Sequence, residues 1–158
     1  MTRIFATILA LVAMSIPTLA QNVEVTNEAL IEVVTVDADG KETITYEPAE
    51  VVAPGDAILY RITYKNVGTE PVEGIVLQSQ IPSDLIITED SAEADGLVVQ
   101  YSIDGGASFA NRGDLVVTTP EGEKRPAEAA DLTNVLWQVG ETLAAEASGS
   151  VSFRGVVK

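Results

Sequence analysis

Residues 54–68 place the strongest constraint on how this chain can fold. They open with a turn at Pro54-Gly55-Asp56, since proline presets one turn dihedral and glycine accepts the next. The side chains that follow alternate between two faces, with Ile58, Tyr60, Ile62 and Tyr64 on one and Leu59, Arg61, Thr63 and Lys65 on the other. Such a period of two, rich in β-branched and aromatic residues, is typical of a strand with one face in a core. We therefore expect this segment to form the central strand of a β-sandwich.

Further segments with the same pattern follow, separated by turn residues about every eight to twelve positions. They span residues 22–36, 43–46, 72–80, 83–87, 97–103, 115–117, 135–139 and 150–157. Residues 118–131 contain two prolines and several charges, and we expect them to be the least ordered loop. Residues 141–147 are predicted to connect into the last strand. Because no helical periodicity follows residue 20, the sequence predicts an all-β fold, an immunoglobulin-like antiparallel β-sandwich.

The first twenty residues have the layout of an export signal. Arg3 supplies a positive start, residues 4–16 form an apolar run, and Pro17 is followed by the small Ala20. A retained membrane anchor is the alternative, but a run of about thirteen residues is shorter than the roughly 20 needed to span a bilayer. We therefore expect residues 1–20 to be a signal peptide helix and residues 21–158 to be an exported β-sandwich domain. Its destination would be the periplasm, the cell surface or the exterior.

The charge balance restricts the partners of the domain. The chain has 9 Lys and Arg against 24 Asp and Glu, which gives a net charge of −15. Such a charge repels nucleic acids and anionic lipids, so we expect no nucleic-acid partner. No segment after residue 20 is apolar enough to cross a membrane, so we expect no membrane span in the mature chain. The sequence contains no histidine or cysteine, the usual ligands of zinc, haem and iron–sulfur clusters. We expect no cofactor, and only hard cations with oxygen ligands, such as calcium, remain compatible with this composition.

Four short motifs occur in an order that resembles a known family. They are Pro54-Gly55-Asp56, the Tyr60-x-Ile62 strand ending in Asn66-Val67-Gly68, Gln80-Ile81-Pro82-Ser83-Asp84-Leu85, and Trp137-Gln138-Val139-Gly140. Together they resemble the conserved repeat domain of bacterial and archaeal surface proteins, also called domain of unknown function eleven. The resemblance covers about residues 50–158. It implies an immunoglobulin-like sandwich, usually strung in arrays on exported envelope or adhesion proteins, without catalytic residues. This chain departs from the family in having a single copy, and in having Gln78-Ser79-Gln80 where an aspartate usually stands.

Two acidic segments are candidates for calcium binding. Glu89, Asp90, Glu93 and Asp95 place four carboxylates within seven residues, which could hold calcium weakly or form a solvated loop. Asp37-x-Asp39-Gly40 resembles the start of a calcium loop. The twelfth position of such a loop needs a glutamate, and this chain has Pro48 there. An Asp-Gly hairpin turn is the better interpretation of residues 37–40.

The segment Ser102-x-Asp104-x-Gly106-x-Ser108-Phe109 resembles the Asp-box, a hairpin motif of sialidases and other β-proteins. Its aspartate can accept backbone N–H groups inside the turn, and its glycine can adopt a positive φ. In sialidases the box lies away from the catalytic site. The motif therefore predicts a hairpin and implies no sialidase activity.

Nothing in the sequence has the pattern of a catalytic centre. A histidine base, a thiol and a Gly-x-Ser-x-Gly elbow are all missing, and Trp137 is expected in the core and not on a ligand platform. Paired carboxylates could hydrolyse glycosides, but the sequence places no two of them on a cleft. We expect an exported, non-catalytic module with a structural or adhesion-like role, contacting a protein partner or itself through strand edges or end loops. A secreted calcium- or carbohydrate-binding module is the alternative.

Overall fold

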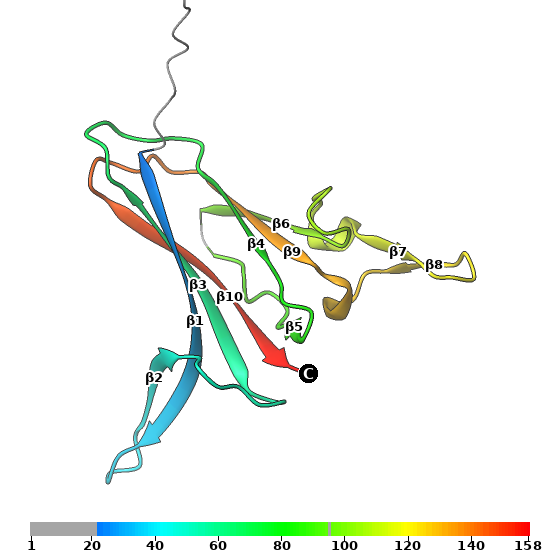
Figure 1. Ribbon diagram of the computed structural model, residues 1–158, viewed down its shortest axis with the longest axis horizontal. Helices are drawn as coiled ribbons and strands as arrows, with labels where there is room; N and C mark the ends of the chain where they lie inside the picture. Colours follow the sequence, from blue (N-terminus) through cyan, green and yellow to red (C-terminus); the bar gives the residue numbers. More distant parts are fainter. Residues whose placement is uncertain (1–21, 95) are drawn as a thin grey trace, which may run out of the picture.

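A computed structural model describes residues 22–94 and 96–158, which form β-strands and two short 3₁₀ turns (Figure 1). The predicted signal peptide lies outside the described residues. The all-β prediction is confirmed. The strands are β1 (Val23–Val36), β2 (Glu42–Pro48), β3 (Ala57–Asn66), β4 (Val76–Gln80), β5 (Leu85–Ile87), β6 (Leu97–Ser102), β7 (Val116–Thr118), β8 (Lys124–Pro126), β9 (Asn134–Val139) and β10 (Ser148–Val157). The 3₁₀ turns are η1 (Arg112–Asp114) and η2 (Ala129–Asp131).

The larger sheet has five strands in the order β2-β1-β3-β10-β5, and every neighbouring pair is antiparallel. Strand β3 lies in the middle, as the alternation of residues 54–68 predicts. The first part of the long strand β1 pairs with β3, from Val23 to Ile31, and its last part pairs with β2. Strand β1 is therefore shared between the body of the sheet and a hairpin at its edge.

A second, three-stranded sheet has the order β4-β9-β6, and β7 pairs with β8. Two predictions need correction here. The strand predicted over residues 72–80 begins only at Val76, because Gly74 adopts φ 67°, outside the range of a strand. The predicted loop over residues 118–131 is wrong, since Lys124–Pro126 pairs with Val116–Thr118 and η2 follows.

Both larger sheets contribute to one hydrophobic core. Trp137 on β9 and Phe153 on β10 are fully buried, and their ring centroids are 6.3 Å apart. Phe153 also stacks on Tyr60 of β3, with 5.0 Å between ring centroids. The indole Nε1–H of Trp137 donates to the carbonyl of Ala92 at 3.0 Å, which satisfies its one polar group. The prediction that Trp137 belongs to the core is confirmed.

A buried asparagine ends the central strand. Asn66 is fully buried, and its Nδ2 donates to the carbonyl of Glu70 at 2.8 Å and to those of Leu143 and Ala144 at 3.1 Å. Its Oδ1 accepts the N–H of Gly68 at 2.9 Å. Buried polar groups need such partners. Asn66 thereby joins the turn after β3 to the connection before β10, and the sequence prediction that residues 141–147 form a connection is confirmed.

The buried phenol of Tyr101 predicts a loss of stability in alkali. Burial, with Glu93, Asp90 and Glu89 nearby, raises the pKa of Tyr101 to about 12, whereas an unfolded tyrosine ionises near 10. The contribution of the protonated phenol to the free energy of unfolding is fully present below pH 10. It is lost as the pH rises from 10 to 12, because the unfolded tyrosine ionises first. Between pH 10 and pH 12, we expect the free energy of unfolding of Tyr101→Phe to fall by about 2 kcal/mol less than that of the wild type, as measured by urea unfolding. Tyr46→Phe, in an exposed strand, is the control, and an equal loss in all three proteins would contradict the prediction.

Candidate interaction surface

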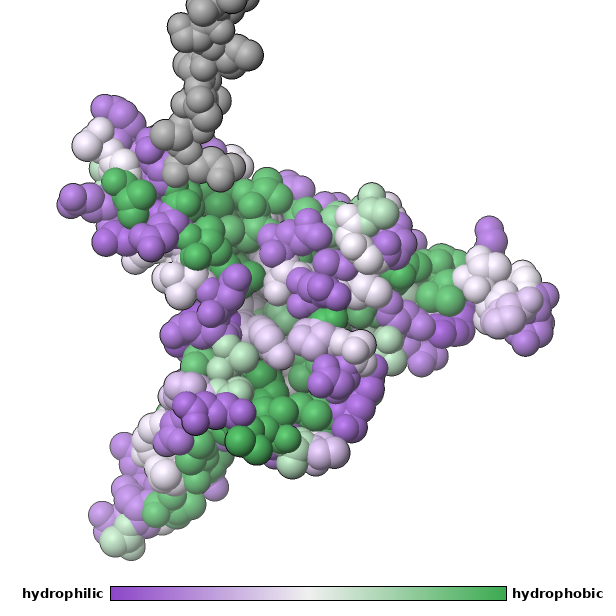
Figure 2. Space-filling model, viewed as in Figure 1, coloured by the Kyte–Doolittle hydropathy of each residue, from purple (hydrophilic) through white to green (hydrophobic). Residues whose placement is uncertain are grey.

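The hairpin of β1 and β2 extends away from the body of the domain (Figure 1). All seven residues of β2 are exposed. The register places Val34 beside Ile44, so both side chains lie on one face of the hairpin, and each is 52% exposed. Figure 2 shows apolar residues reaching along the hairpin toward its tip. A nearly continuous apolar run such as residues 30–34 is typical of a strand covered on both faces. Here Leu30 is buried, but Val34 is exposed.

The turn of this hairpin is built by one aspartate. The Oδ1 of Asp37 accepts the N–H of Asp39 at 3.0 Å and the N–H of Lys41 at 2.9 Å. Gly40 adopts φ 79° and donates its N–H to the carbonyl of Asp37 at 3.0 Å. These are the contacts of an Asp-Gly turn. The hairpin interpretation of residues 37–40 is confirmed.

Side chains on the neighbouring strands hold the base of the hairpin. Arg154 of β10 donates from Nη2 to the hydroxyl of Tyr46 at 3.0 Å, and its Nε lies 3.5 Å from a carboxylate oxygen of Glu32. The guanidinium of Arg61 lies 5.5 Å from the centroid of the Tyr46 ring, within the range of a cation–π contact. Strand β2 is thus tied to β3 and β10 by side chains, although β1 is its only strand partner among the described residues.

The outer edge of β2 has backbone groups without a strand partner among the described residues. The N–H of Asp37 donates to the carbonyl of Lys41, and the N–H of Ala49 donates to the carbonyl of Ala29. Hydrogen-bonded pairs alternate along an antiparallel ladder, so the odd-numbered residues of β2 bond to β1. The N–H and C=O groups of Glu42, Ile44 and Tyr46 therefore point outward. An edge of this kind can accept an additional strand.

The acidic segment predicted as a calcium site is partly engaged in other contacts. Glu89 forms a two-pronged ion pair with Arg112, whose Nη2 and Nε lie 2.8 Å and 3.2 Å from the two carboxylate oxygens. These bonds lower the pKa of Glu89. Asp95 lies outside the described residues, and the structure brings Glu89, Asp90 and Glu93 near Tyr101. Within residues 22–94 and 96–158, no three acidic side chains converge as a metal site. The calcium site stays a prediction.

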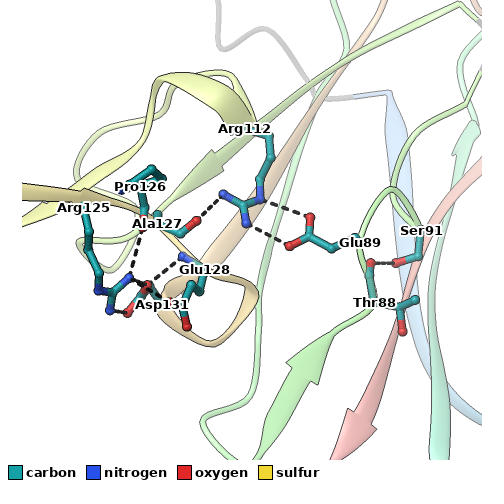
Figure 3. A network of polar contacts seen from close by, with 9 residues as sticks. All are labelled: Thr88, Glu89, Ser91, Arg112, Arg125, Pro126, Ala127, Glu128 and Asp131. Carbon is teal, nitrogen blue, oxygen red and sulfur yellow. Dashed lines mark hydrogen bonds and ion pairs between the residues drawn. The ribbon is translucent and has the colours of Figure 1, made fainter.

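Arg112 belongs to a wider polar network, shown in Figure 3. Its Nη1 donates to the carbonyl of Ala127 at 2.7 Å. Arg125 binds both carboxylate oxygens of Asp131, at 2.6 Å and 3.0 Å, and Asp131 also accepts the N–H of Glu128 at 2.7 Å. The hydrogen bonds from Arg125 lower the pKa of Asp131. These contacts explain why residues 118–131 have a defined structure.

The Asp-box prediction of a hairpin turn is confirmed in its contacts. Asp104 accepts the hydroxyl of Ser102 at 2.6 Å, and the N–H of Ser108 at 3.0 Å. These hydrogen bonds hold the pKa of Asp104 well below its usual range. Gly105 and Gly106 adopt φ 76° and 88°. The aspartate therefore organises its own loop.

A hollow of about 300 Å³ lies beside this turn. Among its lining residues are Gln80, Ser83, Thr133, Asn134 and Lys158, and none of the described residues that line it is an aspartate or a glutamate. The Oδ1 of Asn134 is buried and has no hydrogen-bond partner within residues 22–94 and 96–158. The described part of the hollow offers amide and hydroxyl groups, but no carboxylate pair for glycoside hydrolysis.

Comparison with known proteins adds no relative. No family model, no curated protein and no solved structure matches this chain. Among the described residues there is no helix that could cross a membrane.

The sequence contains the motifs of both turns but no signal for the polar partners of the surface. Glu89 and Arg112 are separated by 23 positions, and Tyr46 and Arg154 by 108. No local pattern relates residues so far apart. The outward direction of the N–H and C=O groups of Ile44 could have been derived from the Asp-Gly turn, because the turn sets the register of the hairpin.

We expect the pair of Glu89 and Arg112 to contribute measurably to stability. A double-mutant cycle with Glu89→Gln, Arg112→Met and the double variant should give a coupling of about 0.5–1 kcal/mol at pH 7, since Glu89 is half exposed. Because the pKa of Glu89 is lowered on folding, this coupling is present above its unfolded pKa near 4.5 and is lost as the pH falls through the folded value.

Urea unfolding at pH 7 and at pH 3 measures this coupling. Lys124→Met is the matched control, since Lys124 is exposed and forms none of the ion pairs found among the described residues. A coupling that is absent at pH 7, or that grows at pH 3, would contradict the prediction.

Proposed function

We propose that this chain is an exported, non-catalytic interaction module, a single immunoglobulin-like β-sandwich of the conserved repeat domain family of surface proteins. The proposed sandwich architecture is supported by the two antiparallel sheets that share one hydrophobic core. The four sequence motifs described above, which occur in the order typical of the conserved repeat domain, support membership of that family. Asn66 and Trp137, which belong to those motifs, are both fully buried, and Asn66 bonds to the turn and connection around it.

The observation that carries the interaction role is the exposed edge of β2. Three residues direct N–H and C=O groups outward, and the strand is held in place by Tyr46 and its arginines. Proteins commonly protect such edges with lysines, prolines or a covering loop. Here Pro48 stands only at the end of the strand, and no lysine lies between Glu42 and Pro48. An ordered edge with few protecting residues suits the addition of a partner strand.

Export is supported by the sequence pattern of residues 1–20, with a positive start, an apolar run and a small residue before Gln21. When the cells that naturally produce this protein are fractionated, we expect the protein in the periplasmic or external fraction to begin at Gln21. N-terminal sequencing of each fraction measures this. Protein that keeps its first twenty residues and stays in the cytoplasm would exclude export.

Photo-cross-linking in the producing cell tests the interaction role. A photoreactive residue in place of Thr45 on β2 should give a defined protein adduct, because that position lies on the outer strand of the sheet. Lys65 is the matched control position, since it is exposed but lies on β3 between β1 and β10. An absence of adducts at position 45, or equal adducts at both positions, would overturn the proposed interaction through β2.

A further inference from the structure

We infer that the partner strand at this edge is the β2 of a second copy, antiparallel to the first and related to it by a two-fold axis at Ile44. This inference rests on the proposed interaction through β2 and names its partner. It would join two five-stranded sheets into one continuous sheet. Such a contact is isologous, because the same patch serves on both copies.

The backbone of β2 is suited to this register. Its outward N–H and C=O groups belong to Glu42, Ile44 and Tyr46, as the ladder to β1 requires. With the axis at Ile44, Ile44 faces the partner's Ile44, and Glu42 faces the partner's Tyr46. Every outward N–H between residues 42 and 46 then meets an outward carbonyl. Pro48, which has no N–H, lies at the end of the paired segment.

The side chains of the same segment are complementary in charge. Residues 41–47 read Lys-Glu-Thr-Ile-Thr-Tyr-Glu, so the axis at Ile44 places Lys41 beside the partner's Glu47. Glu47 in turn lies beside the partner's Lys41. These are non-hydrogen-bonded pairs, in which the Cα atoms approach to about 4.5 Å and the side chains are closest. Two ion pairs therefore form across one short interface, on the face opposite Ile44.

Neighbouring registers lack this match. With the axis at Thr45, Glu42 faces the partner's Pro48, which has no N–H to donate. In the same register Glu47 faces the partner's Thr43, so the ion pair with Lys41 is lost. With the axis at Thr43, Asp39 lies beside the partner's Glu47, and like charges oppose pairing. The sequence around β2 therefore favours the axis at Ile44.

The apolar face of the hairpin gains cover in the same arrangement. Val34 and Ile44 lie side by side in one copy, each about half exposed. Across the axis they are followed by the partner's Ile44 and the partner's Val34, so four β-branched side chains form one row. Cross-strand pairs of this kind stabilise sheets. The net charge of −15 opposes association, so the local complementarity has to offset a general repulsion that salt weakens.

Charge-exchange variants test the register by sedimentation equilibrium of the mature chain at 0.15 M salt, a concentration near physiological ionic strength. Lys41→Glu should weaken the dimer about tenfold or more, and so should Glu47→Lys, because each puts like charges together twice. Glu47→Lys is the decisive variant, since it makes the net charge less negative and general repulsion alone would predict a tighter dimer. The double variant should recover wild-type affinity. A mixture of the two single variants should form heterodimers, because both cross-strand pairs are then of opposite charge.

A backbone variant tests the pairing independently of charge. Ile44→Pro removes an N–H that points outward and is not used by β1, so the hairpin should keep its own ladder. We expect this variant to be monomeric and its thermal midpoint to stay near that of Ile44→Val, which keeps the N–H and the β-branched side chain. Dimers of Ile44→Pro as tight as the wild type would overturn strand pairing.

The outcomes separate this inference from the proposed function. A wild-type chain that stays monomeric at 100 µM, a dissociation constant that would correspond to an association free energy of about −5.5 kcal/mol, overturns self-pairing. So does a dimer that tightens with Glu47→Lys. If position 45 still cross-links to a different protein, the interaction module stands and the second copy does not. If position 45 cross-links to nothing, the proposed function fails as well.

Discussion

The contact of Trp137 with Phe153 between the two larger sheets is the interaction on which the rest of the structure depends. Each ring is fully buried, and Phe153 continues the stack to Tyr60 on the central strand. Large aromatic side chains contribute much of the buried area of a small domain. Because the indole N–H also bonds to Ala92, the same residue attaches the acidic segment to the core. Burial of the rings and order in a surface loop are thus coupled.

Polar contacts fix the peripheral segments onto this core. Asn66 joins two connections at one end of β3, and Arg112 joins the segment after β5 to the segment after β8. The two ions of a surface pair contribute little when they stand alone. A guanidinium that binds a carboxylate with two bonds and a backbone carbonyl with a third has a defined geometry. These contacts therefore matter more for the shape of the loops than for the total stability of the domain.

The hairpin of β1 and β2 differs from the body of the domain in its exposure, since every residue of β2 is exposed. Its order comes from the Asp37 turn at one end and from Tyr46 with Arg154 and Arg61 at the other. An isolated two-stranded hairpin is marginally stable in water. Support at both ends keeps β2 extended, so that its outer edge presents hydrogen-bonding groups in a fixed register. This is the physical basis of the interaction role proposed above.

Local chemistry was enough to indicate the strands other than β8, the position of β3 and the turns at Asp37 and Asp104, because alternation and turn preferences act over a few residues. The sequence alone did not show that residues 118–131 are ordered, since Arg112 reaches that segment from outside it. Nor did it show that β2 lies at an edge. Which side of a strand stays without a neighbour depends on pairings between residues distant in the chain, and only the tertiary structure decides those.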